Sequence, residues 1–230
     1  MKWGVVTFPG SNDHRDTVYA IEKVLGYSAT SLWHASGELE DCDAIVLPGG
    51  FSYGDYLRAG ALARLSPIMQ SVIAFANTGG PVLGICNGFQ ILCEAGLLPG
   101  ALVRNRDRRF LCRNVRLNVE NNSTAFTCLM ARGETITIPI KHGEGCYVAS
   151  QQEIATMEEQ GHVVFRYVDG APNGAQNDIA GVTNAQGNVV GLMPHPEHAV
   201  EEVLGTSGDG RSIFASAALW SSDTAARERA

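Results

Sequence analysis

The sequence predicts an α/β fold: an open, mostly parallel sheet flanked by helices, joined to antiparallel strands in the second half of the chain. In the first half, short apolar runs alternate with segments of helical spacing, which is typical of β-α-β units and a parallel sheet. In the second half, turns separate the apolar runs and several runs alternate apolar with polar residues, which favours antiparallel pairing. The 230 residues contain no linker long enough to divide them, so we expect a single domain over 1–230.

Composition argues against several classes of function. The net charge of −7 disfavours a nucleic-acid partner, because binding to phosphates requires a basic face. No apolar run approaches the roughly 20 residues that span a bilayer, and the first residues lack the charged and apolar regions of a signal peptide. The six cysteines show no C-x-x-C pairing, so we expect reduced thiols in a cytoplasmic protein and no metal site.

The first half of the chain predicts four strands separated by helices. Asn12 or Asp13 is placed to cap the first helix, which should run to about Leu25 before Gly26 ends it. In the second helix, one apolar face should contain Leu62, Leu65, Ile68, Met69, Val72, Ile73 and Phe75. The strands are expected at 2–8, 28–34, 44–47 and 81–85, and the later helices at about 60–77 and from the turn at 86 to near 97–100.

The second half predicts five short strands and a final helix. The strands are expected at 114–119, 135–140, 163–168, 179–183 and 189–193. Residues 169–178 contain Pro172-Asn173-Gly174 and should form a long surface loop. A helix is expected at about 210–220, and the charged tail at 225–229 should fray.

The stretch 81–90, PVLGICNGFQ, points to a nucleophile. It begins as an apolar strand, turns through Cys86 and continues as the first turns of a helix. A reactive side chain between Gly84 and Gly88 at such a turn is typical of a nucleophile elbow, with sulfur in place of the serine oxygen. The helix that follows would point free N–H groups at a thiolate. On this stretch alone, a small buried hydrophobic cysteine is an equally good interpretation.

A glycine-rich loop, 49–55, follows the third strand. It lacks the Lys-Ser/Thr of a phosphate-binding loop and would instead present bare backbone N–H groups to an oxyanion. A flexible connection explains the same residues equally well. Because sites in an open parallel sheet lie beyond the carboxyl ends of its strands, residues 9–12, 48–55 and 86 should meet at one rim.

His195 and Glu197 follow the last apolar strand. Pro194 and Pro196 should hold the chain extended, so that side chains two residues apart project to the same side. A histidine beside a carboxylate is a general base with an orienting partner. Alone, this pair is more simply a surface histidine in a turn. An elbow cysteine needs such a base, however, and Cys86, His195 and Glu197 together supply a triad.

Other histidines and a group of arginines are weaker candidates. His142 is the rival base, although the glycines of 141–145 favour a loop that contacts a ligand. For the arginines at 104–109, a solvated loop is the first interpretation, and an anionic ligand or an acidic partner surface is the second. The remaining histidines, expected to be ordinary, are His14, His34, His162 and His198; the basic cluster is Arg104, Arg106, Arg108 and Arg109.

Together, the elbow, the glycine loop and Pro-His-Pro-Glu resemble the class I, or triad, glutamine amidotransferases. Their nucleophile motif is G-x-C-x-G-x-Q, and residues 84–90 match it, with Gln90 separating the motif from a general hydrolase elbow. More narrowly, the chain resembles the glutaminase subunits of phosphoribosylformylglycinamidine synthases, from purine biosynthesis. The matching stretches, in the family's order, are 8–12, 49–55, 84–90, 140–145, 173–174, 193–197 and 209–210.

Three positions depart from the family pattern. His14 follows Asn12-Asp13 where the family usually has Cys-Asp, and Cys146 stands where Asn or Arg is expected. Asn114 follows Cys112-Arg113 where a larger residue is common. None belongs to the triad, so these departures bear on the rim of the site and on partner contact.

The resemblance implies a role for each candidate residue. Cys86 attacks the carboxamide of L-glutamine, His195 protonates the departing ammonia and then activates water, and Glu197 orients the imidazole. The resemblance further assigns the backbone N–H groups of Gly50 and Asn87 to an oxyanion hole, and Gln90, His142 and Gly143 to substrate binding.

The resemblance also implies partners. The chain shows no nucleotide site and is expected to hold no cofactor, so its ammonia must be used elsewhere. A large synthetase subunit that binds ATP and Mg²⁺ is expected to receive the ammonia through the interface, with a small bridging subunit in the assembly. The isolated chain should therefore show low glutaminase activity.

Two other functions are open. A stand-alone cysteine hydrolase of another amide, ester or γ-glutamyl bond would use the same fold, although Gln90 and the block 140–145 argue against it. A non-catalytic interaction protein could keep the same scaffold, but the intact set of Cys86, His195 and Glu197 argues against that class.

Overall fold

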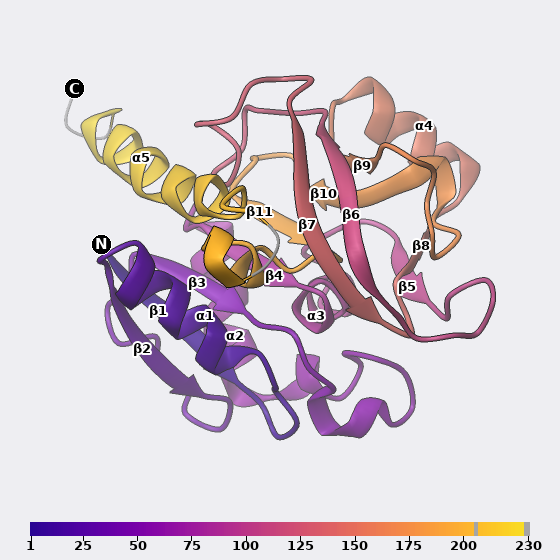
Figure 1. The fold of residues 1–230 in the computed structure, drawn as a ribbon. Coiled ribbons are helices and arrows are strands. Elements are labelled where there is room, and N and C mark those ends of the chain that lie inside the picture. The colour runs from indigo at the N-terminus through magenta and orange to yellow at the C-terminus, as the bar shows by residue number, and fades with distance from the viewer. Residues whose placement is uncertain (205–206, 228–230) are drawn as a thin grey trace.

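A nine-stranded sheet forms the centre of the molecule in the computed structural model, which describes residues 1–204 and 207–227 (Figure 1). The strand order is β2-β1-β3-β4-β11-β10-β9-β6-β7, and a separate antiparallel pair joins β5 to β8. The strands are β1 (Lys2–Thr7), β2 (Ser28–Trp33), β3 (Ala44–Leu47), β4 (Val82–Ile85), β5 (Ala101–Val103), β6 (Leu111–Val119), β7 (Thr135–His142), β8 (Cys146–Val148), β9 (Val163–Tyr167), β10 (Ile179–Thr183) and β11 (Val189–Leu192).

The sheet has a parallel half and an antiparallel half, which confirms the predicted fold class. Strands β2, β1, β3, β4 and β11 are parallel neighbours, and β10, β9, β6 and β7 continue the sheet with antiparallel pairing. In Figure 1 the N-terminal strands (indigo) and the β6–β7 pair (pink) lie on opposite sides of β4 and β11, and β2 and β7 are the two edges of the sheet.

Strand β11 corrects one part of the sequence prediction. The sequence pattern groups it with the antiparallel strands, yet it pairs in parallel with β4 and antiparallel with β10. Its residues are buried along the whole strand, as expected for a central strand covered on both faces. β11 therefore joins the two halves of the sheet and lies directly beside the strand that leads to Cys86.

The register of β4 and β11 brings the two halves of the candidate site together. Gly191 pairs with Gly84 and Leu192 with Ile85, so both strands end at the same edge of the sheet. The N–H of Cys86 donates a 2.8 Å hydrogen bond to the carbonyl of Leu192. Residues that follow the two strands must therefore emerge side by side.

The helices differ from the sequence prediction mainly at their ends. They are α1 (His14–Tyr19), which continues as a π-helical turn (Ala20–Val24), α2 (Pro67–Asn77), α3 (Asn87–Glu94), α4 (Gln151–Glu159) and α5 (Arg211–Arg227). The helix expected at 60–77 begins only at Pro67, after a short 3₁₀ turn at 63–65. Ser66 is extended because a residue before proline avoids the helical region. Leu65 consequently leaves the expected apolar face and is 70% exposed.

Helix α4 and the β5–β8 pair were not predicted. Helix α4 carries a capping box, in which Ser150 and Glu153 accept hydrogen bonds from each other's backbone N–H. Its S-x-x-E signature is visible in the sequence. Helix α3 ends at Glu94, earlier than expected, and β6 begins at Leu111.

Two expectations about the surface were wrong in part. The loop 169–178 is not wholly exposed, because Asn173 is completely buried and hydrogen-bonded. The C-terminal helix extends to Arg227 instead of ending near 220, so 225–227 are helical, while 228–230 lie outside the described residues. None of the helices in the described ranges is long and apolar enough to span a membrane.

One contiguous apolar core fills both faces of the sheet. Trp3 of β1 is fully buried, and its ring meets Phe214 of α5 edge-on, with centroids 5.9 Å apart. Phe89 of α3 stacks on Tyr147 of β8. The helix that carries the elbow is therefore packed between the main sheet and the β5–β8 pair, which fixes its position.

Candidate active site

Cys86 occupies a strained turn between β4 and α3. Its φ of 51° and ψ of −103° place a non-glycine residue in a rarely occupied region, as a nucleophile elbow requires. The flanking glycines allow the elbow to pack closely against neighbouring chain. A Cβ on Gly88 would lie 1.9 Å from the carbonyl oxygen of Leu47, and one on Gly84 would lie 2.5 Å from Leu92 Cδ1. The thiol faces the carbonyl of Lys141 at 3.9 Å. The structure thus confirms the elbow.

His195 and Glu197 form a buried hydrogen-bonded pair, as predicted. Nδ1 of His195 lies 2.6 Å from Oε1 of Glu197. The predicted extended conformation was wrong, because Pro196–His198 forms a 3₁₀ turn that folds Glu197 back under the imidazole. The N–H of His195 donates a 2.8 Å hydrogen bond to the carbonyl of Pro139 and so ties this turn to β7.

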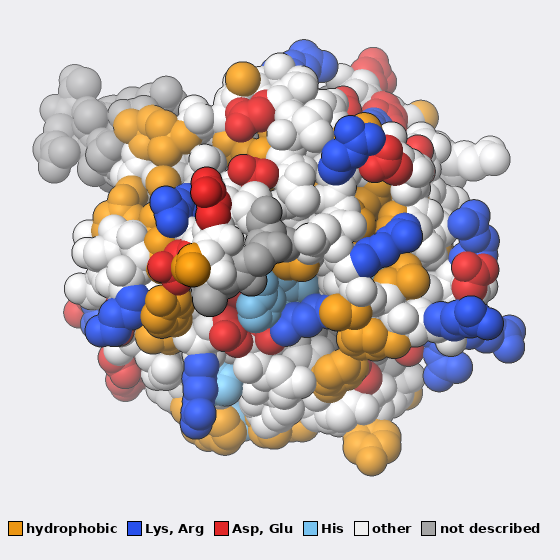
Figure 2. Space-filling model, viewed as in Figure 1, with side chains coloured by type: hydrophobic (Ala, Val, Ile, Leu, Met, Phe, Trp, Pro, Cys, Tyr) orange, Lys and Arg blue, Asp and Glu red, His pale blue; other side chains and the backbone are white. Residues whose placement is uncertain are grey.

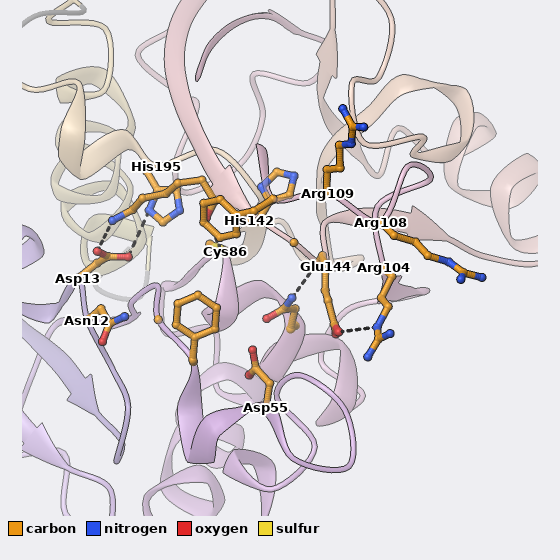
Figure 3. A pocket seen from close by; sticks show the side chains of 16 residues that line it. Asn12, Asp13, Asp55, Cys86, Arg104, Arg108, Arg109, His142, Glu144 and His195 are labelled. Atoms are coloured by element: carbon orange, nitrogen blue, oxygen red, sulfur yellow. Dashed lines mark hydrogen bonds and ion pairs between the residues drawn. The ribbon is translucent and has the colours of Figure 1, made fainter. Parts of the chain in front are cut away.

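The electrostatics of His195 suit a proton carrier. Burial opposes a charge on the ring, but the Glu197 carboxylate and then Cys86 outweigh it and raise the pKa of His195 to about 10. Nε2, on the far side of the ring from Glu197, makes no hydrogen bond to any described residue. Figure 3 shows His195 and Cys86 on the same side of the pocket. A protonated imidazole beside a cysteine stabilises the thiolate, which is the nucleophilic form.

Asp13 is a member of the site that sequence analysis missed. Asn12 or Asp13 was expected to cap α1, and Asp13 is the residue at that position, but its side chain makes no capping hydrogen bond. Its carboxylate instead accepts a 2.5 Å hydrogen bond from Lys141 Nζ and lies 3.5 Å from His195 Nδ1 (Figure 3). Burial opposes its charge, but His198, His195 and Lys141 hold the pKa of Asp13 well below its usual range. Asp13 directly follows 9–12, the segment expected at the rim.

Gly49 and His198 complete the surroundings of this carboxylate. A Cβ on Gly49 would lie 2.3 Å from Asp13 Oδ2 and 2.7 Å from His195 Cε1, so the missing side chain provides the space in which they meet. His198 was expected to be ordinary. Its Nε2 lies 3.6 Å from Asp13 Oδ1 and 3.5 Å from Glu197 Oε1, so this histidine belongs to the site.

His142 is not a rival base. It is the last residue of β7, is 3% exposed, and accepts a 3.1 Å hydrogen bond at Nε2 from Asn173. Burial, and then the charge of His195, lower the pKa of His142 to about 3. Its ring is therefore neutral at physiological pH. Asn173 also donates to the carbonyl of Gly145, which shapes the loop after β7.

The proposed oxyanion donors lie on either side of the elbow. Gly50 has a φ of 149° and forms an isolated antiparallel bridge with Ser11. Among the described residues its N–H makes no hydrogen bond. The N–H of Asn87 is the first of α3, and amides of a first helical turn have no acceptor within the helix. Both donors are thus available.

Gln90 and Asn87 link the elbow helix to its neighbours through their side chains. Gln90 Nε2 donates a 2.6 Å hydrogen bond to the carbonyl of Glu144, and its Oε1 accepts from Asn87 Nδ2 at 2.9 Å. Asn87 Oδ1 accepts from the N–H of Ser52. The amide of Gln90 therefore holds the loop 141–145 in place, and Gln90 also lines the cavity.

A cavity of about 440 Å³ opens above the elbow. Arg104 pairs with Glu144 at its mouth, with Nε and Oε1 3.3 Å apart, and Figure 3 shows Arg108 and Arg109 on the same side. All four arginines are exposed in the loop between β5 and β6, as the first interpretation of the basic cluster expects, and three of them also line the cavity. The lining residues are Asn12, Asp13, Gly50, Phe51, Asp55, Cys86, Gln90, Arg104, Arg108, Arg109, Phe110, Lys141, His142, Gly143, Glu144 and His195.

Asp55 lines this cavity together with two other acidic residues, Asp13 and Glu144. Burial, and then the nearby Glu144 carboxylate, raise the pKa of Asp55 to about 6. Asn87 Nδ2 contacts Asp55 Oδ1 at 3.4 Å. The cavity thus combines acidic side chains beside α3 with arginines at its mouth, which suits a small ligand carrying both charges.

Comparison with known proteins agrees with this geometry. Residues 1–221 match the family model of the CobB/CobQ-like glutamine amidotransferase domain. The phosphoribosylformylglycinamidine synthase subunit PurQ of Chlorobaculum parvum is 57% identical over 221 residues, covering 93% of this chain and 87% of the relative. The subunit of the same name from Corynebacterium glutamicum is 57% identical over 216 residues, covering 94% of this chain and 96% of the relative.

Solved structures give the same result. A chain in the structure of PurLQS from Thermotoga maritima superposes with a TM-score of 0.87 and 46% identity, covering 95% of this chain and 98% of that one. A glutamine amidotransferase from the same organism shares the fold, with a TM-score of 0.56 and 18% identity over 87% of this chain and 77% of that one. The chain therefore belongs to the glutamine amidotransferases of the CobB/CobQ-like type and, within them, to the family of phosphoribosylformylglycinamidine synthase PurQ subunits.

Proposed function

We propose that this chain is a glutaminase subunit that hydrolyses L-glutamine to glutamate and ammonia for phosphoribosylformylglycinamidine synthase in purine biosynthesis. The observation that carries the proposal is the strained Cys86 elbow beside the buried pair of His195 and Glu197, at the base of a cavity of about 440 Å³. A carboxamide is a poor electrophile, and covalent catalysis divides its hydrolysis into two easier steps.

In the first step Cys86 Sγ attacks the side-chain carbonyl carbon of glutamine. The tetrahedral oxyanion accepts hydrogen bonds from the backbone N–H groups of Gly50 and Asn87, each contributing about 3 kcal/mol to transition-state stabilisation. His195, protonated beside Glu197, gives the proton from Nε2 to the departing nitrogen. Ammonia leaves, and a γ-glutamyl thioester remains on Cys86.

In the second step water replaces ammonia. Neutral His195 takes a proton from water, the resulting hydroxide attacks the thioester carbon, and the same N–H groups hold the second oxyanion. Collapse breaks the C–S bond, releases glutamate and returns the thiolate beside a protonated His195. Gln90, His142 and Gly143 contact the substrate in this proposal, supported by their position on the cavity lining.

The partners follow from the relatives. The chain itself holds no cofactor in this proposal, and a large synthetase subunit with ATP and Mg²⁺ consumes the ammonia, which passes through the interface. A small bridging subunit completes the assembly in the cytoplasm. The PurQ names of the relatives and the PurLQS neighbour support this arrangement. The synthetase product is formylglycinamidine ribonucleotide, made from formylglycinamide ribonucleotide.

A rate measurement tests the activity and the coupling. Glutamate release should be slow for the purified chain and much faster with its synthetase and bridging subunits, and Cys86→Ala should abolish both rates. Equal rates with and without partners would contradict the coupling.

Chemical labelling identifies the nucleophile. The glutamine-directed electrophile diazo-oxo-norleucine should modify Cys86, as shown by peptide mass mapping. Cys93 on the same helix is the internal control, because burial raises the pKa of its thiol and its Sγ faces the carbonyl of Pro99. An unmodified Cys86 in a chain that hydrolyses another amide or γ-glutamyl bond would instead support the stand-alone hydrolase.

A further inference from the structure

Four metal-binding atoms converge behind the imidazole of His195, on the side away from Cys86. They are Nδ1 of His195, Nε2 of His198 and one carboxylate oxygen each from Asp13 and Glu197, and all lie within 4.8 Å of one another. Glu197 and His198 belong to the 3₁₀ turn after β11, His195 directly precedes that turn, and Asp13 directly precedes α1. Figure 2 shows histidine side chains (pale blue) at the centre of this face, between acidic and basic groups.

The spacing of these atoms matches a tetrahedral zinc ion. Ligand atoms bound at 2.0–2.1 Å in a tetrahedron lie about 3.3 Å from one another. His195 Nδ1 lies 3.5 Å from Asp13 Oδ2, and His198 Nε2 lies 3.5 Å from Glu197 Oε1 and 3.6 Å from Asp13 Oδ1, so the two histidines approach different oxygens of the Asp13 carboxylate. The 2.6 Å hydrogen bond between His195 and Glu197 must lengthen, because the proton it contains would be replaced by the metal.

Burial and charge also suit a divalent cation. The side chains of His195, Glu197 and Asp13 are 1%, 0% and 5% exposed, whereas that of His198 is 28% exposed and leaves a way in from solvent. Oε2 of Glu197 is buried and accepts no hydrogen bond from the described part of the chain. Two carboxylates face one Lys141 ammonium, so the site favours a divalent cation once that cation has displaced the proton of His195.

We propose that Asp13, His195, Glu197 and His198 form a binding site for Zn²⁺ that is incompatible with catalysis. Two imidazole nitrogens and two carboxylate oxygens are a ligand set that zinc accepts. Zinc on Nδ1 displaces the proton shared with Glu197. The metal also withdraws electron density from the ring, so Nε2 becomes a weak base, and His195 no longer gives a proton to the departing nitrogen or takes one from water. Zinc binding is independent of the function proposed above, whereas its inhibitory effect rests on that function.

Direct metal binding tests the site without any assay of activity. The Cys86→Ala chain removes the thiol beside the site, and after alkylation of accessible thiols such as the exposed Cys112 it should bind one Zn²⁺ in equilibrium dialysis with metal analysis. Adding His198→Ala in that background should weaken binding at least about tenfold, because the site loses a ligand. Adding His162→Ala, a histidine before β9, is the matched control and should change nothing. No bound zinc, or binding that His198→Ala leaves unchanged, overturns the site.

A second variant and a spectroscopic measurement guard against loss of folding. Asp13→Asn, in the same background and with circular dichroism to verify the fold, should also weaken zinc binding. Co²⁺ in place of Zn²⁺ should give the intense visible absorption of a tetrahedral ion, and His198→Ala should change that spectrum. A six-coordinate spectrum, or one that is identical in the His198→Ala chain, contradicts the assignment.

Inhibition is measured on the assembly with Cys86 intact. Zn²⁺ should suppress glutamine hydrolysis, and a chelator should restore it. The His198→Ala assembly should need more zinc than the parent to lose the same fraction of its own metal-free rate. Zinc that binds this site without slowing the reaction would overturn the inhibitory part. Absence of glutamine hydrolysis in metal-free protein would overturn the proposed function instead, while the dialysis result decides the zinc site by itself.

Discussion

Oδ2 of Asp13 lies 3.5 Å from Nδ1 of His195, the same nitrogen that contacts Glu197 at 2.6 Å. The imidazole therefore meets two buried carboxylates, one from its own turn and one from the far end of the chain. Lys141 neutralises the more distant carboxylate, so Glu197 is left as the principal partner. This arrangement predicts how the site responds to substitution.

Glu197→Gln should lower kcat by about 10²-fold, less than the roughly 10⁴-fold loss when a serine-protease triad loses its only carboxylate. The reason is that Asp13 still favours the protonated imidazole. Asp13→Asn combined with Glu197→Gln should lower kcat further. Steady-state glutaminase rates of the assembled enzyme decide the matter, and a double variant no slower than Glu197→Gln would mean that Asp13 makes no contribution.

Lys141→Met should destabilise the chain by about 2 kcal/mol, because it leaves the buried Asp13 carboxylate without its ammonium. The loss is smaller than for a fully buried pair since the Lys141 side chain is 32% exposed. Urea unfolding measures the effect. Asp13→Asn in the same chain should recover much of the loss, which a double-mutant cycle would reveal as coupling. Additive effects of the two substitutions would contradict the pairing.

Gly49→Ala should lower kcat by tenfold or more, with a smaller effect on stability. The added Cβ would lie 2.3 Å from Asp13 Oδ2 and 2.7 Å from His195 Cε1 and must displace the imidazole from its position. Gly37→Ala is the matched control, because a Cβ there meets nothing within 4 Å. The two variants are compared by kcat and by thermal melting. Equal activity of both would contradict the close contact.

Asp55→Asn should stabilise the chain at neutral pH and have little effect near pH 4. Because the folded pKa of Asp55 is about 6 and its ordinary value is 3.8, the native state retains a proton that the unfolded state has already lost between these values. The parent therefore loses stability as pH rises through this window, and the Asn variant does not. Solvent screening keeps the gain to about 1 kcal/mol.

Thermal melts from pH 4 to 8 follow that difference. In a Glu144→Gln chain the pH range over which stability is lost should end at a lower pH. The reason is that the negative charge of Glu144, which raises the pKa of Asp55, is gone. If the difference in melting temperature between the parent and the Asp55→Asn chain stays constant with pH, the pKa of the Asp55 carboxyl is not raised.

The parts of the site that depend on local spacing could be predicted from the sequence. Cys86 between two glycines specifies an elbow wherever a strand meets a helix, and His195 and Glu197 are close enough in sequence for either an extended or a turned backbone to bring them together. The conformation of that turn was wrong, yet the pairing was right. Apolar runs likewise located the strands of the main sheet to within a few residues.

Contacts between distant segments could not be predicted in this way. The link between Asp13 and Lys141 joins α1 to β7, and nothing in either local pattern specifies the partner. Asp13 also stands where an aspartate commonly caps a helix. Its place in the sequence therefore suggested a capping role and gave no sign of its role in the site. The pairing of β11 with β4 failed for the same reason, because an apolar strand does not reveal its neighbour's direction.

The central place of β11 has a consequence for biosynthesis. As the chain leaves the ribosome, β4 must keep one apolar edge unpaired until residues 189–192 have been made, and Cys86 has no base until His195 follows. Such a long-range pairing forms late, and an open edge in a nascent sheet invites aggregation. The growing chain therefore exposes this edge until β11 has been made, and it has a complete triad only after Glu197 has been added.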